Sequence, residues 1–173
     1  MDLKEYIASI PGFPKEGIIF RDITPILQEP KAMHYVIEAF KKFVEGLDAD
    51  VILAPEARGF LFGVPVASEC ELSFVPVRKP RKLPREVITQ TYDLEYGQDS
   101  LCMHVDAIHP GDKVVIIDDL LATGGTVGAM IKMVERMHAQ VVGCGFVIEL
   151  DDLNGRRLFE NIPVCSLTHF EGE

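Results

Sequence analysis

The chain has 173 residues and a formal net charge of −10 at pH 7, with 47% hydrophobic and 25% charged residues. This composition is typical of one globular domain of ordinary size. The acidic balance argues against a nucleic-acid partner, which would require a broad basic face. The sequence has no apolar run of the roughly 18 residues that a membrane span needs, and its first ten residues do not resemble a signal peptide. We therefore expect a cytoplasmic protein with no membrane partner.

Cysteine and histidine spacing does not predict a metal centre built by the protein. The cysteines are far apart in the sequence, and most lie in apolar segments, which favours free thiols in a reducing compartment. The histidines form no ligand motif. We expect no residue of the chain to serve as a dedicated metal ligand.

The N-terminal region predicts a short helix followed by an irregular but ordered segment. Apolar residues recur at helical spacing before Pro11, namely Leu3, Tyr6, Ile7 and Ile10. Residues 11–30 contain four prolines and two glycines among apolar residues, with a short strand expected at Ile18–Phe20. An unstructured tail would carry fewer apolar residues. This region should therefore cover another part of the protein, and we call residues 1–30 the hood.

The next elements alternate between helix and strand. One amphipathic helix should run from Pro30 to Gly46, and a second helix should cover 60–70, where Pro65 should kink its first turns. Apolar runs predict buried strands at 50–54 and 74–77. Arg58 follows the first of these strands and precedes a glycine, so it is either a surface arginine or a ligand for an anion at the strand end.

Residues 78–85 form the one basic patch of this acidic chain. Five cations occur in eight residues: Arg78, Lys79, Arg81, Lys82 and Arg85. Such a run is often only a solvated charged face. Its position directly after a strand instead favours an anion site at the carboxyl edge of the sheet. The sequence from 79 to 98 shows little helical pattern, so we expect a mobile lid there, followed by a short strand at 101–105.

The stretch VVIIDDLLATGGT, at Val114–Thr126, organises the predicted fold. Four β-branched residues predict a buried parallel strand, and the residues after Gly124 have the periodicity of an amphipathic helix. The motif therefore lies where a strand of an α/β sheet passes into a helix. Ligands of such sheets bind at the carboxyl ends of the strands.

The residue types of this turn indicate a phosphate site beside a diol site. Glycines let the backbone approach an anion, and the start of the helix adds partial positive charge. We call this segment the glycine turn; its residues are Ala122, Thr123, Gly124, Gly125 and Thr126. Asp118 and Asp119 would repel a phosphate but would accept hydrogen bonds from sugar hydroxyls, or act through Mg²⁺. The combination predicts a ribose 5-phosphate site, and the alternative is a tight turn with solvated acids.

The chain ends with a buried strand at 141–150, a short helix at 155–159 and an edge strand at 164–167. Alternating strands and helices with apolar strands predict an α/β fold, with a single domain built on a mostly parallel central sheet flanked by helices. The hood should lie over the carboxyl edge of that sheet.

The sequence DDLLATGGT at Asp118–Thr126 resembles the phosphoribosyl-pyrophosphate-binding motif of type I phosphoribosyltransferases. The resemblance covers nearly the whole chain and is strongest to the members that use adenine. It extends to FPKEGIIFRDITPIL in the hood, EARGFLFG at Glu56–Gly63, VRKPRKLP at Val77–Pro84 and TYDLEYG at Thr91–Gly97.

This resemblance implies a reaction in which adenine and phosphoribosyl pyrophosphate give AMP and pyrophosphate, through an oxocarbenium-like transition state. The glycine turn would hold the 5′-phosphate, and Asp118 and Asp119 the ribose hydroxyls. Arg58 would bind pyrophosphate, as would the lid cations Arg78, Lys79 and Lys82. Mg²⁺ would be held mainly through the substrate.

The resemblance also assigns the base side of the site. The backbone of Ile19, Phe20 and Arg21 would read the adenine edge, with Phe20 stacking on the ring. Glu95 would hydrogen-bond the purine at N7 and manage its proton, and Tyr96 would shield the reacting centre. Relatives often have a cis peptide near Glu56–Ala57, often have glycine where this chain has Arg81, and are commonly homodimers.

Two alternatives share the predicted phosphate site. A sister transferase for another purine would lack the hood and the Glu95 motif. A regulator that senses phosphoribosyl pyrophosphate and binds nucleic acid would need a further domain or a basic face. The net charge of −10 disfavours the second alternative.

Overall fold

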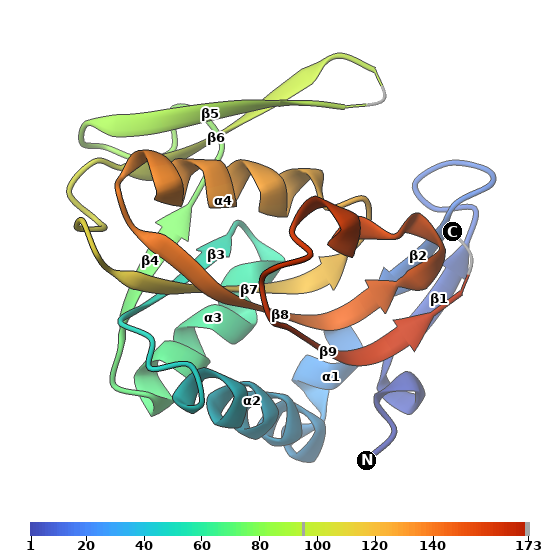
Figure 1. Ribbon diagram of the computed structural model, residues 1–173. Helices are drawn as coiled ribbons and strands as arrows, with labels where there is room; N and C mark the ends of the chain where they lie inside the picture. Colours follow the sequence, from blue (N-terminus) through green and yellow to red (C-terminus); the bar gives the residue numbers. More distant parts are fainter. Residues whose placement is uncertain (95, 172–173) are drawn as a thin grey trace.

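The computed structural model describes residues 1–94 and 96–171. Its centre is a parallel five-stranded sheet with the strand order β4-β3-β7-β8-β9 (Figure 1). The predicted single α/β domain with a mostly parallel sheet is thus confirmed. The strands are β3 (Val51–Pro55), β4 (Ser73–Val77), β7 (Lys113–Leu121), β8 (Gln140–Leu150) and β9 (Val164–Phe170).

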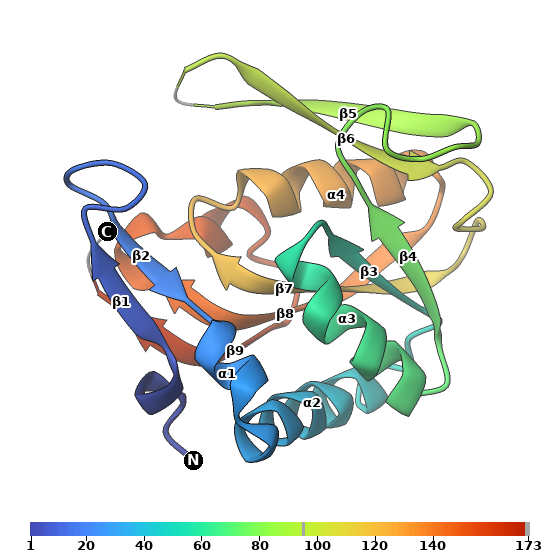
Figure 2. The same cartoon turned by 180° about the vertical axis from the view of Figure 1, so that it is seen from behind.

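Helices cover both faces of the sheet (Figures 1 and 2). One face carries α1 (Thr24–Gln28), α2 (Pro30–Glu45) and α3 (Arg58–Glu69), and the other carries α4 (Gly125–Arg136). Two short 3₁₀ helices, η2 (Asp151–Leu153) and η3 (Gly155–Leu158), connect β8 to β9. Pro65 lies inside α3 without ending it. The predicted helices at 30–46, 60–70 and after Gly124 are all present.

Strand β7 belongs to two hydrophobic cores because its successive side chains point to opposite faces. Val114 and Ile116 pack in the core on the α4 side, whereas Val115 and Ile117 pack with α2 and α3. All four residues are fully buried. The uninterrupted apolar run that predicted a strand is therefore the consequence of burial on both faces.

The N-terminal helix prediction was wrong beyond its first turn. Only the 3₁₀ helix η1 (Leu3–Tyr6) forms, and β1 (Ala8–Pro11) then pairs antiparallel with β2 (Ile19–Asp22). So short a helix is marginal by itself, and the backbone of β1 instead obtains hydrogen-bond partners in β2. We call β1 and β2 the N-terminal ribbon; it lies beside β9 in both views (Figures 1 and 2).

The segment predicted as a mobile lid, residues 79–98, contains the first strand of a β-hairpin. β5 (Val87–Asp93) pairs antiparallel with β6 (Gln98–His104), and the hairpin lies over α4 (Figure 1). The side chains of β5 alternate between more and less exposed positions, which is a strand period rather than a helical one. The strand predicted at 101–105 overlaps β6, but the search for helical periodicity missed β5 and its pairing.

All four cysteines are free thiols, as expected. Cys102 and Cys144 are buried, and burial raises the pKa of Cys144 to about 12, which keeps this thiol protonated and unreactive. In the parts of the chain that the structure describes, no helix is both long enough and apolar enough to span a membrane.

Candidate active site

A cavity of about 260 Å³ opens at the carboxyl ends of β3 and β7. It brings together Arg58, Lys79, the two aspartates 118 and 119, and the whole glycine turn. These residues come from three separate parts of the sequence, and each follows or ends a strand of the sheet. These predicted site residues therefore line one cavity at the carboxyl edge of the sheet.

The glycine turn passes directly into α4. Gly124 has φ 87°, in the left-handed region that favours glycine, and helix α4 begins at Gly125. The first N–H groups of a helix have no partner within it, so the start of α4 offers hydrogen-bond donors and positive potential to the cavity. A Cβ on Gly124 would lie 2.7 Å from the Gly155 carbonyl oxygen, so a larger residue does not fit.

Asp118 and Asp119 form a buried carboxylate pair at the end of β7. They are 9% and 4% exposed, and the Asp119 N–H donates to Asp118 Oδ1 at 2.8 Å. Arg58 Nε lies 2.9 Å from Asp119 Oδ2 as an ion pair. Burial raises the pKa of Asp118 well above its usual value, and the adjacent charge of Asp119 raises it further. Burying such a pair lowers the stability of the folded protein, and its oxygens can accept hydrogen bonds from a polar ligand.

Asp118→Asn should stabilise the unliganded protein at pH 7 by on the order of 1 kcal/mol. The raised pKa means that the folded state binds more protons than the unfolded state above the usual aspartate pKa. This group's contribution to stability is therefore largest at acidic pH and decreases as pH rises. The gain from asparagine should be measured by thermal unfolding at pH 7 and at pH 4, and should largely vanish at pH 4. An equal gain at both pH values would contradict a perturbed carboxyl.

Glu56, which lines the cavity, holds the start of the basic patch in place. Its carboxylate accepts from the Lys79 N–H at 2.6 Å and from Arg78 Nε at 3.2 Å. Burial would raise the pKa of Glu56, but these hydrogen bonds and the charge of Arg78 outweigh burial and lower it. The Lys79 ammonium pairs with Asp99, which also accepts from the Tyr92 hydroxyl at 3.3 Å.

The predicted lid cations therefore differ in position. Lys79 lines the cavity, whereas Arg78 does not and is bound to the lining residue Glu56. Lys82 is exposed, and its carbonyl accepts from Arg78 at 3.5 Å. Arg81 has φ 68°, a conformation that favours glycine. The predicted cis peptide at Glu56–Ala57 is confirmed.

The residues predicted for the base side do not line this cavity in the described structure. Ile19, Phe20 and Arg21 lie in β2, and the Phe20 ring is 5.2 Å from the Arg58 guanidinium carbon. Phe20 therefore contacts Arg58, which lines the cavity, but does not line the cavity itself. Tyr96 is 84% exposed, so the shielding role expected for it is not formed here. Glu95 lies outside the described residues.

Sequence reasoning missed three contributors to this region. Tyr92 lines the cavity, and its ring lies 3.6 Å from a Cβ built on Gly125. The carboxylate of Glu56 was not predicted to fix the basic patch. Gly155 touches the glycine turn from a distant part of the chain. Only Tyr92 left a signal, as an aromatic residue in a segment with strand periodicity.

Comparison with known proteins now gives the class. Residues 22–168 match the phosphoribosyl transferase domain family, so the chain belongs to the phosphoribosyltransferases. Within that class it belongs to the adenine phosphoribosyltransferase family. The adenine phosphoribosyltransferase of Streptococcus uberis is 54% identical over 172 residues, which are 99% of this chain and 100% of the relative.

Solved structures agree with this placement. The adenine phosphoribosyltransferase of Thermoanaerobacter pseudethanolicus has a TM-score of 0.94 at 51% identity, over 97% of this chain and 98% of that one. The Saccharomyces cerevisiae enzyme has a TM-score of 0.91 at 42% identity, over 96% of each chain. The latter was crystallised with adenine and D-2,5-dideoxy-2,5-imino-altritol 1,6-bisphosphate.

Proposed function

We propose that this enzyme transfers the 5-phosphoribosyl group of phosphoribosyl pyrophosphate to adenine, giving AMP and pyrophosphate for purine salvage. The observation that carries the proposal is the single cavity in which the glycine turn, a buried carboxylate pair and Arg58 meet. A phosphate, a sugar diol and a pyrophosphate are the ligand groups that suit these three parts. The named relatives and the adenine complex of the yeast enzyme support the choice of base.

In this proposal the N9–C1′ bond forms as the bond from C1′ to the pyrophosphate oxygen breaks. Pyrophosphate leaves with the electron pair, and adenine loses one proton, which Glu95 accepts as the general base. Asp118 and Asp119 hold the ribose hydroxyls and stabilise positive charge at an oxocarbenium-like C1′. Arg58 and Lys79, which line the cavity, bind the leaving group, with Arg78 and Lys82 joining them when the lid closes.

Mg²⁺ fits this site mainly through substrate oxygens. The carboxylates of the cavity lining are Glu56, Asp118 and Asp119. Glu56 is bound to Lys79 and Arg78, and Asp119 is paired with Arg58. Asp118 and Asp119 would meet the ion only through the bound ribose. Bound Mg²⁺ would neutralise pyrophosphate charge.

The ribbon and the hairpin flank this cavity and would serve as hood and lid. Phe20 of the ribbon already contacts Arg58, and Tyr92 of the hairpin lines the cavity. We propose that the lid, residues 79–98, closes over the bound substrates, excludes water and brings Glu95 and Tyr96 to the base. The backbone of Ile19–Arg21 would then read the adenine edge.

The assembly that we propose is a homodimer in the cytoplasm. Support comes from the family and from two exposed apolar side chains one turn apart on α3, Leu61 and Val64. Light scattering after size-exclusion chromatography should give twice the mass of 19.3 kDa. A monomeric mass at assay concentration would contradict the dimer but not the reaction.

The test of function is AMP formation from adenine, phosphoribosyl pyrophosphate and Mg²⁺, with hypoxanthine, guanine and xanthine in parallel. Turnover should be confined to adenine. Glu95→Gln should lower kcat by roughly 100-fold or more, because general acid–base groups contribute on that order. Glu38→Gln, at an exposed position of α2 outside the lid, is the matched control and should retain activity.

Other outcomes would support the alternatives. Turnover of an oxopurine in place of adenine would indicate a sister transferase. Tight binding of phosphoribosyl pyrophosphate without turnover of any base would indicate a regulator. Full activity of Glu95→Gln would remove that residue from the mechanism and leave the reaction unaffected.

A further inference from the structure

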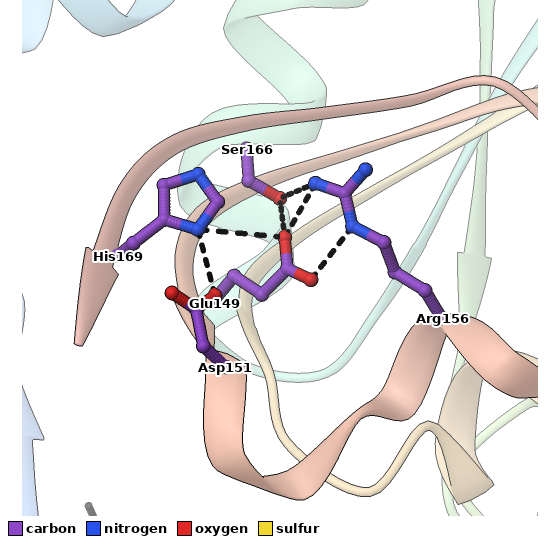
Figure 3. A network of polar contacts seen from close by, with 5 residues as sticks. All are labelled: Glu149, Asp151, Arg156, Ser166 and His169. Atoms are coloured by element: carbon purple, nitrogen blue, oxygen red, sulfur yellow. Dashed lines mark hydrogen bonds and ion pairs between the residues drawn. The ribbon is translucent and has the colours of Figure 1, made fainter. Parts of the chain in front are cut away.

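A polar network outside the cavity joins the ends of β8 and β9 to the loop between them (Figure 3). Glu149 at the end of β8 accepts from Arg156 Nε at 2.6 Å and from Arg156 Nη2, also at 2.6 Å. Ser166 of β9 donates its hydroxyl to the same carboxylate at 2.5 Å. We call Glu149, Arg156 and Ser166 the brace.

The brace is a strong contact because one of its charges is buried. Glu149 is 6% exposed, and burial alone would raise its pKa. The hydrogen bonds from Arg156 and Ser166 and the arginine charge outweigh burial and lower that pKa. A two-pronged arginine–carboxylate pair also fixes the direction of both side chains. The brace therefore holds the loop 151–158 in one position relative to the sheet.

The same corner offers three groups that suit a metal ion. Ligand atoms of Glu149, Asp151 and His169 lie within 4.8 Å of one another. However, both carboxylate oxygens of Glu149 already accept from Arg156, which supplies the positive charge that a cation would bring. The geometry thus favours an internal support over a metal site.

The loop held by the brace presses on the glycine turn. Gly155 immediately precedes Arg156, and a Cβ built on it would lie 2.5 Å from the Ala122 carbonyl oxygen and 3.2 Å from the Gly124 nitrogen. In the other direction, a Cβ on Gly124 would lie 2.7 Å from the Gly155 carbonyl oxygen. The two backbones are therefore in direct contact, with no room for a side chain on either.

We propose that Arg156 is a positioning residue for the phosphate-binding turn, acting through Gly155. Its two hydrogen bonds to Glu149 hold Gly155 against Ala122 and Gly124. This contact fixes the direction of the N–H groups of the glycine turn. The inference rests on the proposed function, in which that turn holds the 5′-phosphate. Arg156 itself does not line the cavity.

The test compares Arg156→Ala, Arg156→Lys and Gly155→Ala in steady-state assays and in calorimetric titrations with ribose 5-phosphate. Arg156→Ala and Gly155→Ala should raise the KM for phosphoribosyl pyrophosphate and the Kd for ribose 5-phosphate by roughly 10- to 100-fold, because small misplacements of binding groups cost that much. The KM for adenine should stay within about twofold, since the turn holds only the phosphoribosyl group. Arg156→Lys should show a smaller rise in KM and Kd than Arg156→Ala, because lysine keeps the positive charge but cannot form both hydrogen bonds to Glu149.

Two controls separate positioning from general stability. Lys113→Ala removes a surface ion pair with Asp48, 2.8 Å long, at the other end of β7. Val36→Ala removes buried volume from α2, far from the turn. Both should leave the KM for phosphoribosyl pyrophosphate unchanged. Should Arg156→Ala fail to fold, Arg156→Lys and Ser166→Ala, which each weaken the brace, carry the same comparison.

The outcomes distinguish this inference from the function on which it rests. Wild-type protein that does not bind ribose 5-phosphate would overturn the proposed function and this inference together. Wild-type binding with unchanged values in the Arg156 variants would overturn the inference alone. A third outcome is that Arg156→Ala raises both KM values equally, to the same extent as a Val36→Ala variant of similar stability. In that case the brace would be only a general structural contact.

Discussion

Gly124→Ala is expected to lower kcat/KM for phosphoribosyl pyrophosphate by about 100-fold or more. Alanine at φ 87° costs roughly 1–2 kcal/mol, and its Cβ would lie 2.7 Å from a backbone oxygen of Gly155. The glycine turn must therefore move, and its N–H groups lose their common direction. Steady-state kinetics and thermal unfolding of the purified variant measure the two effects.

Gly111→Ala is the matched control for this substitution. Gly111 has φ 88°, nearly the same as Gly124, but a Cβ there meets nothing within 4 Å. It lies in the turn before β7, at the end of the sheet opposite the cavity. Both variants should lose similar stability from backbone strain, whereas only Gly124→Ala should lose activity. Comparable activity losses would show that the contact with Gly155 is unimportant.

Arg58→Ala should have the second large effect, on activity and on stability together. Arg58 pairs with Asp119, which is 4% exposed and adjacent to the buried Asp118. Removing the guanidinium leaves a buried carboxylate without its counter-charge, at a cost of about 1–3 kcal/mol at pH 7. The proposed pyrophosphate contact is lost as well, so kcat/KM should fall by roughly 100- to 1,000-fold.

The pH dependence and a double variant separate these two losses. Burial and the charge of Asp119 raise the pKa of Asp118, whereas the charge of Arg58 lowers it. The part of the Arg58→Ala destabilisation that acts through Asp118 should therefore shrink as the pH falls and Asp118 becomes protonated. Arg58→Ala combined with Asp119→Asn should regain most of the stability at pH 7, because neither member of the pair is then charged. Activity should not return. Additive stability losses in the double variant would show that the ion pair does not couple the two residues.

The central elements of the fold were predictable because their sequence patterns report burial directly. The apolar run of β7 is buried on both faces, and the periodicity of α4 matches the side that it packs on the sheet. In the N-terminal ribbon and the β5–β6 hairpin, only one strand of each pair was predicted, at 18–20 and at 101–105, and the partner strands β1 and β5 were not. In each, a strand pairs antiparallel with the next strand of the chain, and the hairpin also packs on α4; the search for helical periodicity does not detect such pairing.

The same distinction holds for the site. The glycine turn and the two aspartates are adjacent in sequence, so residue types alone indicated a phosphate beside a diol. The attachment of Glu56 to Lys79 and Arg78, and the contact of Gly155 with the glycine turn, join segments far apart in the chain. Such contacts arise only when the sheet is assembled, so no spacing rule could indicate them.

The junction of the ribbon with β9 has a consequence for biosynthesis. The guanidinium of Arg21 lies 4.2 Å from the centre of the Phe170 ring and donates to Ser9, and Lys4 lies over the same ring. The ribbon precedes β9 in the chain, so it cannot complete this contact until β9 has been synthesised. In newly made chains, the sheet and the glycine turn should form before the hood packs against β9. This contact between segments far apart in the sequence should therefore form late in folding.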